Sequence, residues 1–270
     1  MRSEAFDFSG KLVFVAGGSS GINLAIADAF AAHGAALAIA SRSAERVAAA
    51  QRQLERHGGK VAGYVADVRD YAAIEAALRG CYEAFGAIDV LVSGAAGNFV
   101  APALGMSAKG FRSVVDIDLI GGFNVTRAAH AFLRRPGASV LNISAPQAAN
   151  PTRYQAHVCA AKAGLDMLMR VLALEWGPDG IRVNSLIPGP IGDTEGISRL
   201  APGAEALARM SASVPLGRMG TKQEVAEMAL MLASPMASFV TGAAIAVDGG
   251  VSLLGGRDLS GALAGANCKT

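Results

Sequence analysis

An apolar run meets a glycine-rich turn at Leu12-Val13-Phe14-Val15-Ala16-Gly17-Gly18-Ser19-Ser20-Gly21-Ile22-Asn23. The first five residues predict a buried β-strand, and the pattern from Ile22 to His33 predicts a helix that ends at Gly34. Glycines allow a sharp turn between the two and let backbone N–H groups approach a pyrophosphate at the helix N-terminus. An ordinary strand–helix loop can have the same residues, so the rest of the chain must decide between the two interpretations.

Short apolar runs and longer amphipathic stretches go on alternating along the chain. The runs predicted as strands are Leu12–Ala16, Ala36–Ala40, Val61–Val65, Val90–Ser93, Ser139–Ser144, Arg182–Ile187 and Ala244–Val247. Helical patterns separate most of them, including one from Ala44 to His57. Continuously apolar strands spaced by helices are typical of a parallel sheet covered on both faces. The sequence therefore predicts an α/β fold with a doubly wound, mainly parallel sheet in a single domain, residues 1–270.

One stretch breaks this rhythm. Residues 188–219 carry Gly, Pro, Asp and Thr, with a short helical pattern from Ala204 to Met210. Loops inserted at the carboxyl edge of such a sheet often cover a ligand, so this region is expected to cover the substrate. The Gly- and Ala-rich tail after Gly255 is expected to lie on the surface or against a partner subunit.

Composition narrows the class of protein. The chain has 270 residues, of which 52% are hydrophobic and 17% charged, as in a well-buried globular enzyme. The net charge of +2 gives no reason to expect nucleic acid or an anionic membrane surface as a partner. Three widely spaced cysteines favour free thiols in the cytoplasm over a disulfide framework, and no metal site is expected. The chain shows no apolar signal core, no membrane span and no C-terminal Ser-Lys-Leu-type peroxisomal address.

The end of the second predicted strand bears on the choice of cofactor. An acidic residue there would accept a hydrogen bond from the ribose 2′-hydroxyl of NAD, but the sequence reads Ala40-Ser41-Arg42-Ser43. Ser41 and Arg42 can instead hold a 2′-phosphate, Arg42 through charge-assisted hydrogen bonds. The alternative is a solvated surface arginine. The sequence favours NADP(H) over NAD(H).

Several ordered motifs together resemble the short-chain dehydrogenases/reductases, which have a Rossmann-type fold. The turn from Ala16 to Asn23 is similar to the family's Thr-Gly-x-x-x-Gly-x-Gly, with Ala16 for the Thr and Asn23 for the last Gly. Similar motifs follow at Asp67-Val68, Ser93-Gly94-Ala95-Ala96-Gly97-Asn98, Ile187-Pro188-Gly189-Pro190-Ile191, Val240-Thr241-Gly242 and Val247-Asp248-Gly249-Gly250, so that the resemblance spans residues 9–252. The cofactor-binding residues it implies are Gly17, Ser19, Ser20, Gly21, Ile22, Ser41, Arg42, Asp67, Val68, Ala95, Lys162, Pro188, Gly189 and Ile191. On the residues alone, Asp67 could equally cap the next helix.

The family's catalytic Asn, Ser, Tyr and Lys are only partly present. The resemblance places Asp118 at the Asn position, Ala145 at the Ser position and Val158 at the Tyr position, and only Lys162 matches. Tyr154 is off the usual register. Ser144 is expected to be structural if the strand continues past it, because neighbouring strand residues point to opposite faces. His157 is expected to be a helix-surface histidine or a satisfied packing histidine and not an acid.

These departures resemble the peroxisomal-type 2,4-dienoyl-CoA reductases, in which Asp and Lys stand in for the tyrosine. The resemblance rests on Ala95–Phe99, Asp116-Ile117-Asp118, His157 before Lys162, and Pro188–Gly196. It implies an acyl-CoA substrate, a trans-3-enoyl-CoA product and a homotetramer. Hydride added at Cδ of a dienoyl thioester spreads charge onto the thioester oxygen, so the site needs donors there and a proton at Cα.

The resemblance suggests a role for each of four residues. Asp118 would position a water that supplies the proton, and Lys162 would hold the nicotinamide ribose. Asn98 and Phe99 would face the substrate, with Asn98 donating to the thioester oxygen. Each residue has a structural alternative: a backbone contact for Asp118, surface exposure for Lys162, and a turn and a core contact for Asn98 and Phe99.

Two further interpretations of the whole chain stay open. One is another short-chain reductase of keto or enoyl thioesters, which the absent Tyr and Ser disfavour. The other is a non-catalytic NADP-binding regulatory protein. Arg112, Arg153 and Arg199 are candidates to meet the phosphates of CoA.

Overall fold

The computed structural model describes residues 6–201 and 203–254. One seven-stranded sheet runs through it in the order β3-β2-β1-β4-β5-β6-β7, and every neighbouring pair is parallel. The strands are β1 Leu12–Ala16, β2 Ala36–Ser41, β3 Val61–Val65, β4 Val90–Ser93, β5 Ser139–Ile143, β6 Arg182–Pro188 and β7 Ala244–Val247. The predicted doubly wound parallel sheet is confirmed, and each predicted strand is present to within one residue at either end.

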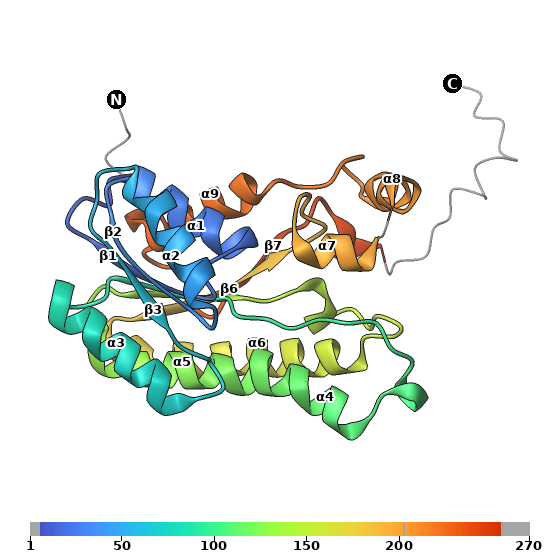
Figure 1. Ribbon diagram of the computed structural model, residues 1–270, viewed down its shortest axis with the longest axis horizontal. Helices are drawn as coiled ribbons and strands as arrows, with labels where there is room; N and C mark the ends of the chain where they lie inside the picture. Colours follow the sequence, from blue (N-terminus) through green and yellow to red (C-terminus); the bar gives the residue numbers. More distant parts are fainter. Residues whose placement is uncertain (1–5, 202, 255–270) are drawn as a thin grey trace, which may run out of the picture.

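Helices cover both faces of the sheet. They are α1 Gly21–Ala32, α2 Ala44–Glu55, α3 Tyr71–Phe85, α4 Ala108–Val115, α5 Gly121–Ala129, α6 Ala156–Trp176, α7 Glu195–Leu200, α8 Ala204–Ser213 and α9 Lys222–Ala233. Figure 1 shows α1, α2 and α9 on one face and α3, α5 and α6 on the other. Each face packs its own apolar core, because strands buried on both sides present apolar side chains in both directions.

The chain reverses its order of strands between β1 and β4. After β3 it crosses back over the sheet, so the loops that follow β1 and β4 diverge and leave a crevice at their carboxyl ends. The region 188–219 lies beside this edge, where it forms α7 and α8 (Figure 1). The helical pattern predicted from Ala204 to Met210 is therefore confirmed as α8, which extends to Ser213.

Local capping explains where several helices begin. Ser43, Asp70 and Thr194 each accept a hydrogen bond from a backbone N–H in the first turn of α2, α3 and α7. Thr221 and Glu224 form a capping box at the start of α9. Among the residues described, no helix is both long and apolar enough to span a membrane. The tail after Gly255 lies outside the described residues.

Candidate active site

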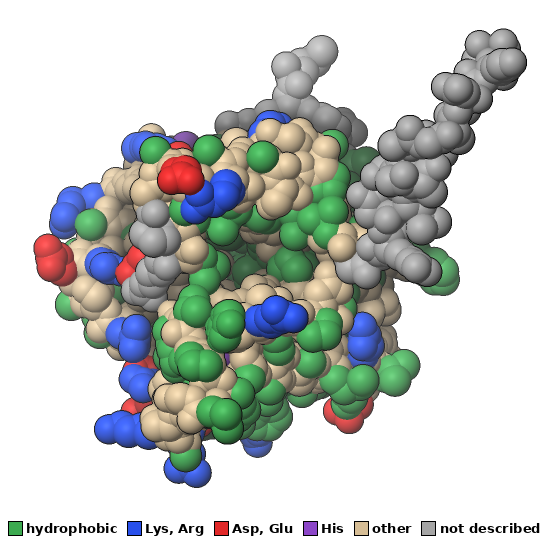
Figure 2. All heavy atoms as spheres, turned by 90° about the vertical axis from the view of Figure 1, so that its right-hand side faces the viewer, with side chains coloured by type: hydrophobic (Ala, Val, Ile, Leu, Met, Phe, Trp, Pro, Cys, Tyr) green, Lys and Arg blue, Asp and Glu red, His purple; other side chains and the backbone are tan. Residues whose placement is uncertain are grey.

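A large cavity opens at the carboxyl ends of the strands. Its volume is about 1540 Å³, and residues from both halves of the sheet and from region 188–219 line it. Figure 2 looks into this hollow, whose walls are mostly apolar. Pockets for one small ligand usually measure about 300–1,000 Å³, so this cavity has room for two ligands side by side. All the predicted site residues except Phe99 line it.

The glycine-rich turn forms one end of the cavity. Gly17 and Gly21 have φ angles of 79° and 60°, values that side chains other than glycine's rarely adopt. A Cβ on Gly17 would lie 2.9 Å from the backbone nitrogen of Ala95, whereas a Cβ on Gly21 would project into open space. Ser20 begins α1 without a side-chain cap, and the first turn has no acidic residue. The backbone N–H groups there are free to bind an anion, as a pyrophosphate cradle requires.

Asn23 connects this turn to the loop after β4. Its Nδ2 donates to the carbonyl oxygen of Gly94 at 2.7 Å and to that of Gly17 at 3.3 Å. A Cβ on Gly94 would lie 2.2 Å from Asn23 Oδ1. Asn23 replaces the last glycine of the motif, and its structural role here was not predicted from the sequence.

The carboxyl ends of β2 and β3 form the next part of the wall. Ser41, Arg42, Asp67 and Val68 line the cavity as predicted. Asp67 binds Arg69 through several hydrogen bonds, and these, together with the nearby charge of Arg42, lower the pKa of the Asp67 carboxyl. Asp67 still lines the cavity and can meet a ligand there. It does not cap α3, because the N-cap of that helix is Asp70.

Arg46 also lines the cavity, although the sequence did not single it out. It lies in the first turn of α2, and its Nη1 is 3.8 Å from Oε2 of Glu195 at the start of α7. Both side chains are more than half exposed, so this ion pair contributes little stability. It does show that α2 and α7 of region 188–219 meet at the wall of the cavity.

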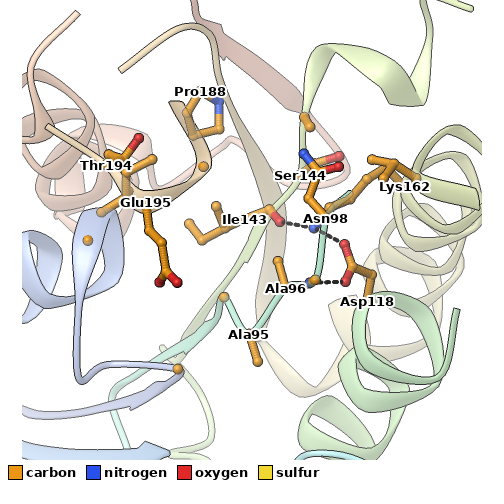
Figure 3. Close-up of a pocket in the computed structure, with 18 of the residues that line it drawn as sticks. Ala95, Ala96, Asn98, Asp118, Ile143, Ser144, Lys162, Pro188, Thr194 and Glu195 are labelled. Atoms are coloured by element: carbon orange, nitrogen blue, oxygen red, sulfur yellow. Dashed lines mark hydrogen bonds and ion pairs between the residues drawn. The ribbon is translucent and has the colours of Figure 1, made fainter. Parts of the chain in front are cut away.

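The opposite wall comes from β6 and the residues after it. Pro188, Gly189 and Ile191 line the cavity. A Cβ on Gly189 would lie 2.6 Å from the Cα of Asp248, which explains why glycine is needed at this point. In Figure 3, Thr194 and Glu195 lie on this side, across the pocket from Asp118 and Lys162.

Asp118 and Lys162 form a buried ion pair. Nζ of Lys162 lies 3.2 Å from Oδ2 of Asp118 and donates to the carbonyl oxygen of Ile143 at 2.9 Å (Figure 3). Oδ1 of Asp118 accepts from the backbone N–H of Gly97 at 2.7 Å. The two side chains are 1% and 6% exposed, yet both line the cavity, so a ligand can reach the pair where bulk water hardly does.

A π-helical turn places Asp118. Residues Asp116–Ile120 form this turn between α4 and α5, and π-turns inside helices occur often at functional sites. Lys162 comes from the second turn of α6, which packs against the π-turn. The pair therefore bridges two helices. Lys162 is not the surface group that its alternative supposed, whereas Asp118 does make a backbone contact, with Gly97, in addition to its ion pair.

Three carboxamide side chains follow one another along the same wall. Nε2 of Gln147 donates to Oε1 of Gln155 at 2.8 Å, and Nε2 of Gln155 donates to Oδ1 of Asn98 at 2.9 Å. All three residues line the cavity. The sequence pointed to Asn98 but not to the two glutamines, which belong to no motif.

Phe99 and His157 pack together behind this wall. Their ring centroids are 4.2 Å apart in an edge-on arrangement, and His157 is fully buried. Burial lowers the pKa of the imidazole, and neither ring nitrogen has a hydrogen-bond partner among the described residues. His157 is therefore a packing residue, one of the two structural roles expected from the sequence, but its ring nitrogens are not satisfied by hydrogen bonds among the described residues. Phe99 lines a smaller adjoining pocket with Asn98, Val100 and Leu200 instead of the main cavity.

Comparison with known proteins identifies the family. A family model described as "Enoyl-(Acyl carrier protein) reductase" matches residues 16–252. The chain belongs to the short-chain dehydrogenase/reductase family. Among solved structures, levodione reductase superposes with a TM-score of 0.87 at 30% identity, covering 91% of this chain and 99% of that one. A short-chain dehydrogenase from Bacillus anthracis gives 0.80 at 35% identity, covering 90% and 96%.

Curated relatives within this family carry more specific names. The chain is 44% identical over 253 residues to a peroxisomal 2,4-dienoyl-CoA reductase, (3E)-enoyl-CoA-producing, of Pongo abelii, covering 93% of this chain and 87% of that protein. It is 41% identical to the (3E)-enoyl-CoA-producing protein of Saccharomyces cerevisiae, covering 92% and 86%. A probable 2,4-dienoyl-CoA reductase of Bacillus subtilis, (2E)-enoyl-CoA-producing, is 38% identical, covering 89% and 96%.

The catalytic site of this chain differs from the usual family site at the positions that the sequence analysis named. Ala145 and Val158 line the cavity at the places of the family's Ser and Tyr. β5 ends at Ile143, so the premise for a structural Ser144 fails. Ser144 lines the cavity, and its buried hydroxyl has no hydrogen-bond partner among the described residues.

Tyr154 does not replace the missing phenol. It precedes α6, which begins at Ala156, and has a φ of 65°. Its side chain is 56% exposed, and it is not among the cavity-lining residues. Of the arginines considered for the CoA phosphates, Arg153 lines the cavity and Arg112 does not, and the side chain of Arg199 lies outside the described part of the structure.

Proposed function

We propose that this chain is an NADPH-dependent 2,4-dienoyl-CoA reductase that acts in the oxidation of unsaturated fatty acids. The observation that carries the proposal is the buried Asp118–Lys162 pair, which lines a cavity whose Ser and Tyr positions hold Ala145 and Val158. A carbonyl reductase needs an acid at the oxygen that becomes an alcohol. A dienoyl thioester needs hydrogen-bond donors at its oxygen and a proton at carbon.

The cofactor, when bound, supplies a hydride to Cδ of the dienoyl thioester. The chain's own contribution is to hold charge and to deliver a proton. Lys162 has three N–H donors, of which two already face Asp118 and Ile143, so the third can hold a ribose hydroxyl. Asn98 donates to the thioester oxygen while negative charge spreads onto it. Asp118 orients a water that passes one solvent proton to Cα, giving a trans-3-enoyl-CoA.

The position of the proton decides which product forms. Protonation of the dienolate at Cα leaves the remaining double bond at C3, and protonation at Cγ leaves it at C2. The names of the relatives include both outcomes, (3E) for the Pongo abelii and yeast proteins and (2E) for the Bacillus subtilis protein. We favour Cα because Figure 3 shows Asp118 and Asn98 on one side of the pocket. A thioester oxygen bound by Asn98 would bring Cα, two bonds from that oxygen, to the side of Asp118.

NADP(H) is the proposed cofactor. The cradle at Gly21 and the uncapped start of α1 fit a pyrophosphate, which both nicotinamide cofactors share. The end of β2 favours a 2′-phosphate, because Ser41, Arg42 and Arg46 line the cavity there. The end of β2, Ala40-Ser41-Arg42-Ser43, has no acidic side chain to bind a free 2′-hydroxyl. Region 188–219 is proposed to cover the substrate once it is bound.

We also propose a homotetramer in the cytoplasm. Met167, Val171 and Leu174 expose an apolar stripe along α6, which favours burial against another subunit. Cys81 and Cys159 are free thiols, as in a reducing compartment. The peroxisomal names of several relatives point to another compartment, and imaging of the tagged protein in its own cell separates the two.

The proposed function is tested by turnover of 2,4-hexadienoyl-CoA. Purified protein with NADPH should consume both the cofactor and the dienoyl absorbance, and NADH should support a slower reaction. Product analysis should find the trans-3-enoyl-CoA. Folded protein that binds NADPH but reduces neither dienoyl nor keto thioesters would overturn the proposal in favour of a regulatory role. Reduction of 3-oxoacyl thioesters alone would instead favour another short-chain reductase.

A further inference from the structure

The amide chain Gln147–Gln155–Asn98 has a direction. A carboxamide has donors on its nitrogen and acceptor sites on its oxygen, so amides joined end to end must all point the same way. Gln147 donates to Gln155, and Gln155 donates to Asn98. Asn98 lines the cavity, and its Oδ1 already accepts from Gln155. Its Nδ2 is therefore the group that can donate to a ligand in the cavity.

The opposite direction would serve the proposed reaction poorly. If Asn98 donated to Gln155, its oxygen would face the cavity and repel a thioester oxygen that gains negative charge. The direction of the amide chain is therefore a chemical property of the site. Asn98 has this direction through its hydrogen bond from Gln155, whose own oxygen accepts from Gln147.

Gln155 is well placed to fix this direction. It is 3% exposed, and it is the N-cap residue immediately before α6, the helix that carries Lys162. Asn98 belongs to the loop after β4, outside any helix or strand. The hydrogen bond between them thus ties a loop residue to the same helix that positions the ion pair.

We propose that Gln155 is a positioning residue that points the Asn98 N–H group at the thioester oxygen of the substrate. The proposal rests on the proposed function, because it takes an acyl thioester as the ligand at Asn98. Gln155 itself acts through Asn98, and Gln147 supports the direction of the chain from its other end.

Replacing Gln155 by Glu reverses the direction with almost no change of shape. A carboxylate only accepts, so Asn98 would turn its nitrogen toward Glu and its oxygen toward the cavity. Removing one donor from an oxyanion site typically costs about 10²–10³-fold in kcat, and we expect Gln155→Glu to lose about 10²-fold. Gln155→Met, which leaves Asn98 free to rotate, should lose less. Gln53→Glu makes the same chemical change on the exposed face of α2 and should keep wild-type rates.

The pH profile separates this role from a structural one. As the pH falls, protonation gives the carboxyl of the Gln155→Glu variant an O–H that can donate to Asn98 and restore the original direction. The ratio of kcat/KM of Gln155→Glu to that of the wild type should therefore increase as the pH is lowered. The same ratio for Gln155→Met should not change in this way. The KM for NADPH should stay within about twofold, because the Gln155 side chain hydrogen-bonds to Gln147 and Asn98 and to none of the residues proposed to hold the cofactor.

Binding of hexanoyl-CoA, which cannot be reduced, supplies a second readout by calorimetry. Its affinity should fall in Gln155→Glu whether or not the wild type reduces a dienoyl thioester, so failure of the proposed function is distinguishable from failure of this inference. The inference is overturned if Gln155→Glu keeps wild-type kcat and affinity, or if it matches Gln155→Met at every pH. It is also overturned if wild-type protein does not bind the thioester.

Discussion

Asp118 and Lys162 are each almost removed from water, and the energetics of that burial shape what either can do. Two charges withdrawn from water are stable only when each has close partners. Asp118 has Gly97 and Lys162, and Lys162 has Asp118 and the carbonyl of Ile143. A carboxylate fixed by two such partners changes position little, which suits a group that must hold one water in one place.

Asp118→Asn should therefore slow the enzyme while keeping its shape. We expect kcat for dienoyl-CoA reduction to fall by about 10²-fold or more, because an amide orients the water poorly and cannot carry its charge. The unpaired Lys162 should also lower the free energy of unfolding by about 3–5 kcal/mol. Rates are measured under conditions where circular dichroism shows the variant folded.

Asp116→Asn is the matched control for this substitution. It makes the same chemical change in the same π-helical turn, at a residue that does not line the cavity. Its kcat should remain near that of the wild type. Unchanged kinetics of Asp118→Asn would remove Asp118 from the proton step.

His157 predicts how stability depends on pH. Burial lowers its pKa in the folded protein below the ordinary value of 6.5, so the unfolded chain binds the proton more readily. Above pH 6.5 His157 is neutral in both states and does not reduce the free energy of unfolding. As the pH falls below 6.5, the unfolded chain takes up the proton first, so the free energy of unfolding decreases. The decrease can reach about 1.4 kcal/mol per pH unit for one proton.

His157→Leu should reduce this loss of stability in acid. Urea unfolding at pH 7.5 and at about pH 5.5 measures the difference for wild type and variant, since a histidine of the unfolded chain titrates between them. We expect the two proteins to lose unequal amounts, the wild type more. An identical change in both would show that other groups govern acid stability.

Single residues also mark the limit of prediction from the sequence. The family motifs pointed to Asp118, Lys162 and Asn98, because motif position predicts which strand end or helix carries a residue. Gln155 and Gln147 could not be found in this way, since their importance depends on hydrogen bonds between a helix start and two loops. Ser144 was assigned a structural role only on the premise that the strand continues past it. Because β5 ends one residue earlier, at Ile143, strand alternation does not fix where the Ser144 side chain points.

At the scale of elements, Asn23 joins α1 to the end of β4. The strands and their order follow from apolar runs and crossover rules, so the sequence predicted them well. The π-helical turn at Asp116–Ile120 has no such signal, because it depends on how α4 and α5 meet α6. Asn23 is a similar case: its amide spans two loops that are far apart in the sequence.

Gly94→Ala tests that connection. The new methyl group would lie 2.2 Å from Asn23 Oδ1, so the amide must move and its hydrogen bonds to Gly94 and Gly17 must weaken. We expect a loss of about 1–3 kcal/mol in the free energy of unfolding. Gly177→Ala, where a Cβ would meet nothing within 4 Å, should change stability little.

Combining Asn23→Gly with Gly94→Ala should relieve the clash between the new methyl group and the Asn23 amide. The double variant should be more stable than the sum of the two single losses predicts, with a coupling of about 0.5–3 kcal/mol from the four-protein cycle. Urea unfolding of the wild type, both single variants and the double variant gives that number. Strict additivity would mean that Asn23 does not contact Gly94 as the structure shows.

At the scale of the whole molecule, the sheet and its two helical layers leave one face of α6 exposed. Met167, Val171 and Leu174 lie three or four residues apart, so they share that face, and Phe123 of α5 is also exposed. Exposed apolar stripes of this kind mark interaction surfaces more often than free surface. A second copy of the chain can cover the stripe with its own, because a twofold interface pairs a surface with itself.

Light scattering after size-exclusion chromatography tests the proposed homotetramer. The wild type should run with the mass of four chains, and Val171→Glu with Leu174→Glu should run as a smaller species, because charges in a buried interface lack partners. Leu104→Glu places the same charge on a fully exposed leucine outside α5 and α6 and should leave the mass unchanged. A monomeric wild type would contradict the assembly. A tetrameric double variant would instead place the interface elsewhere, since two glutamates on α6 could not be buried without a large loss of stability.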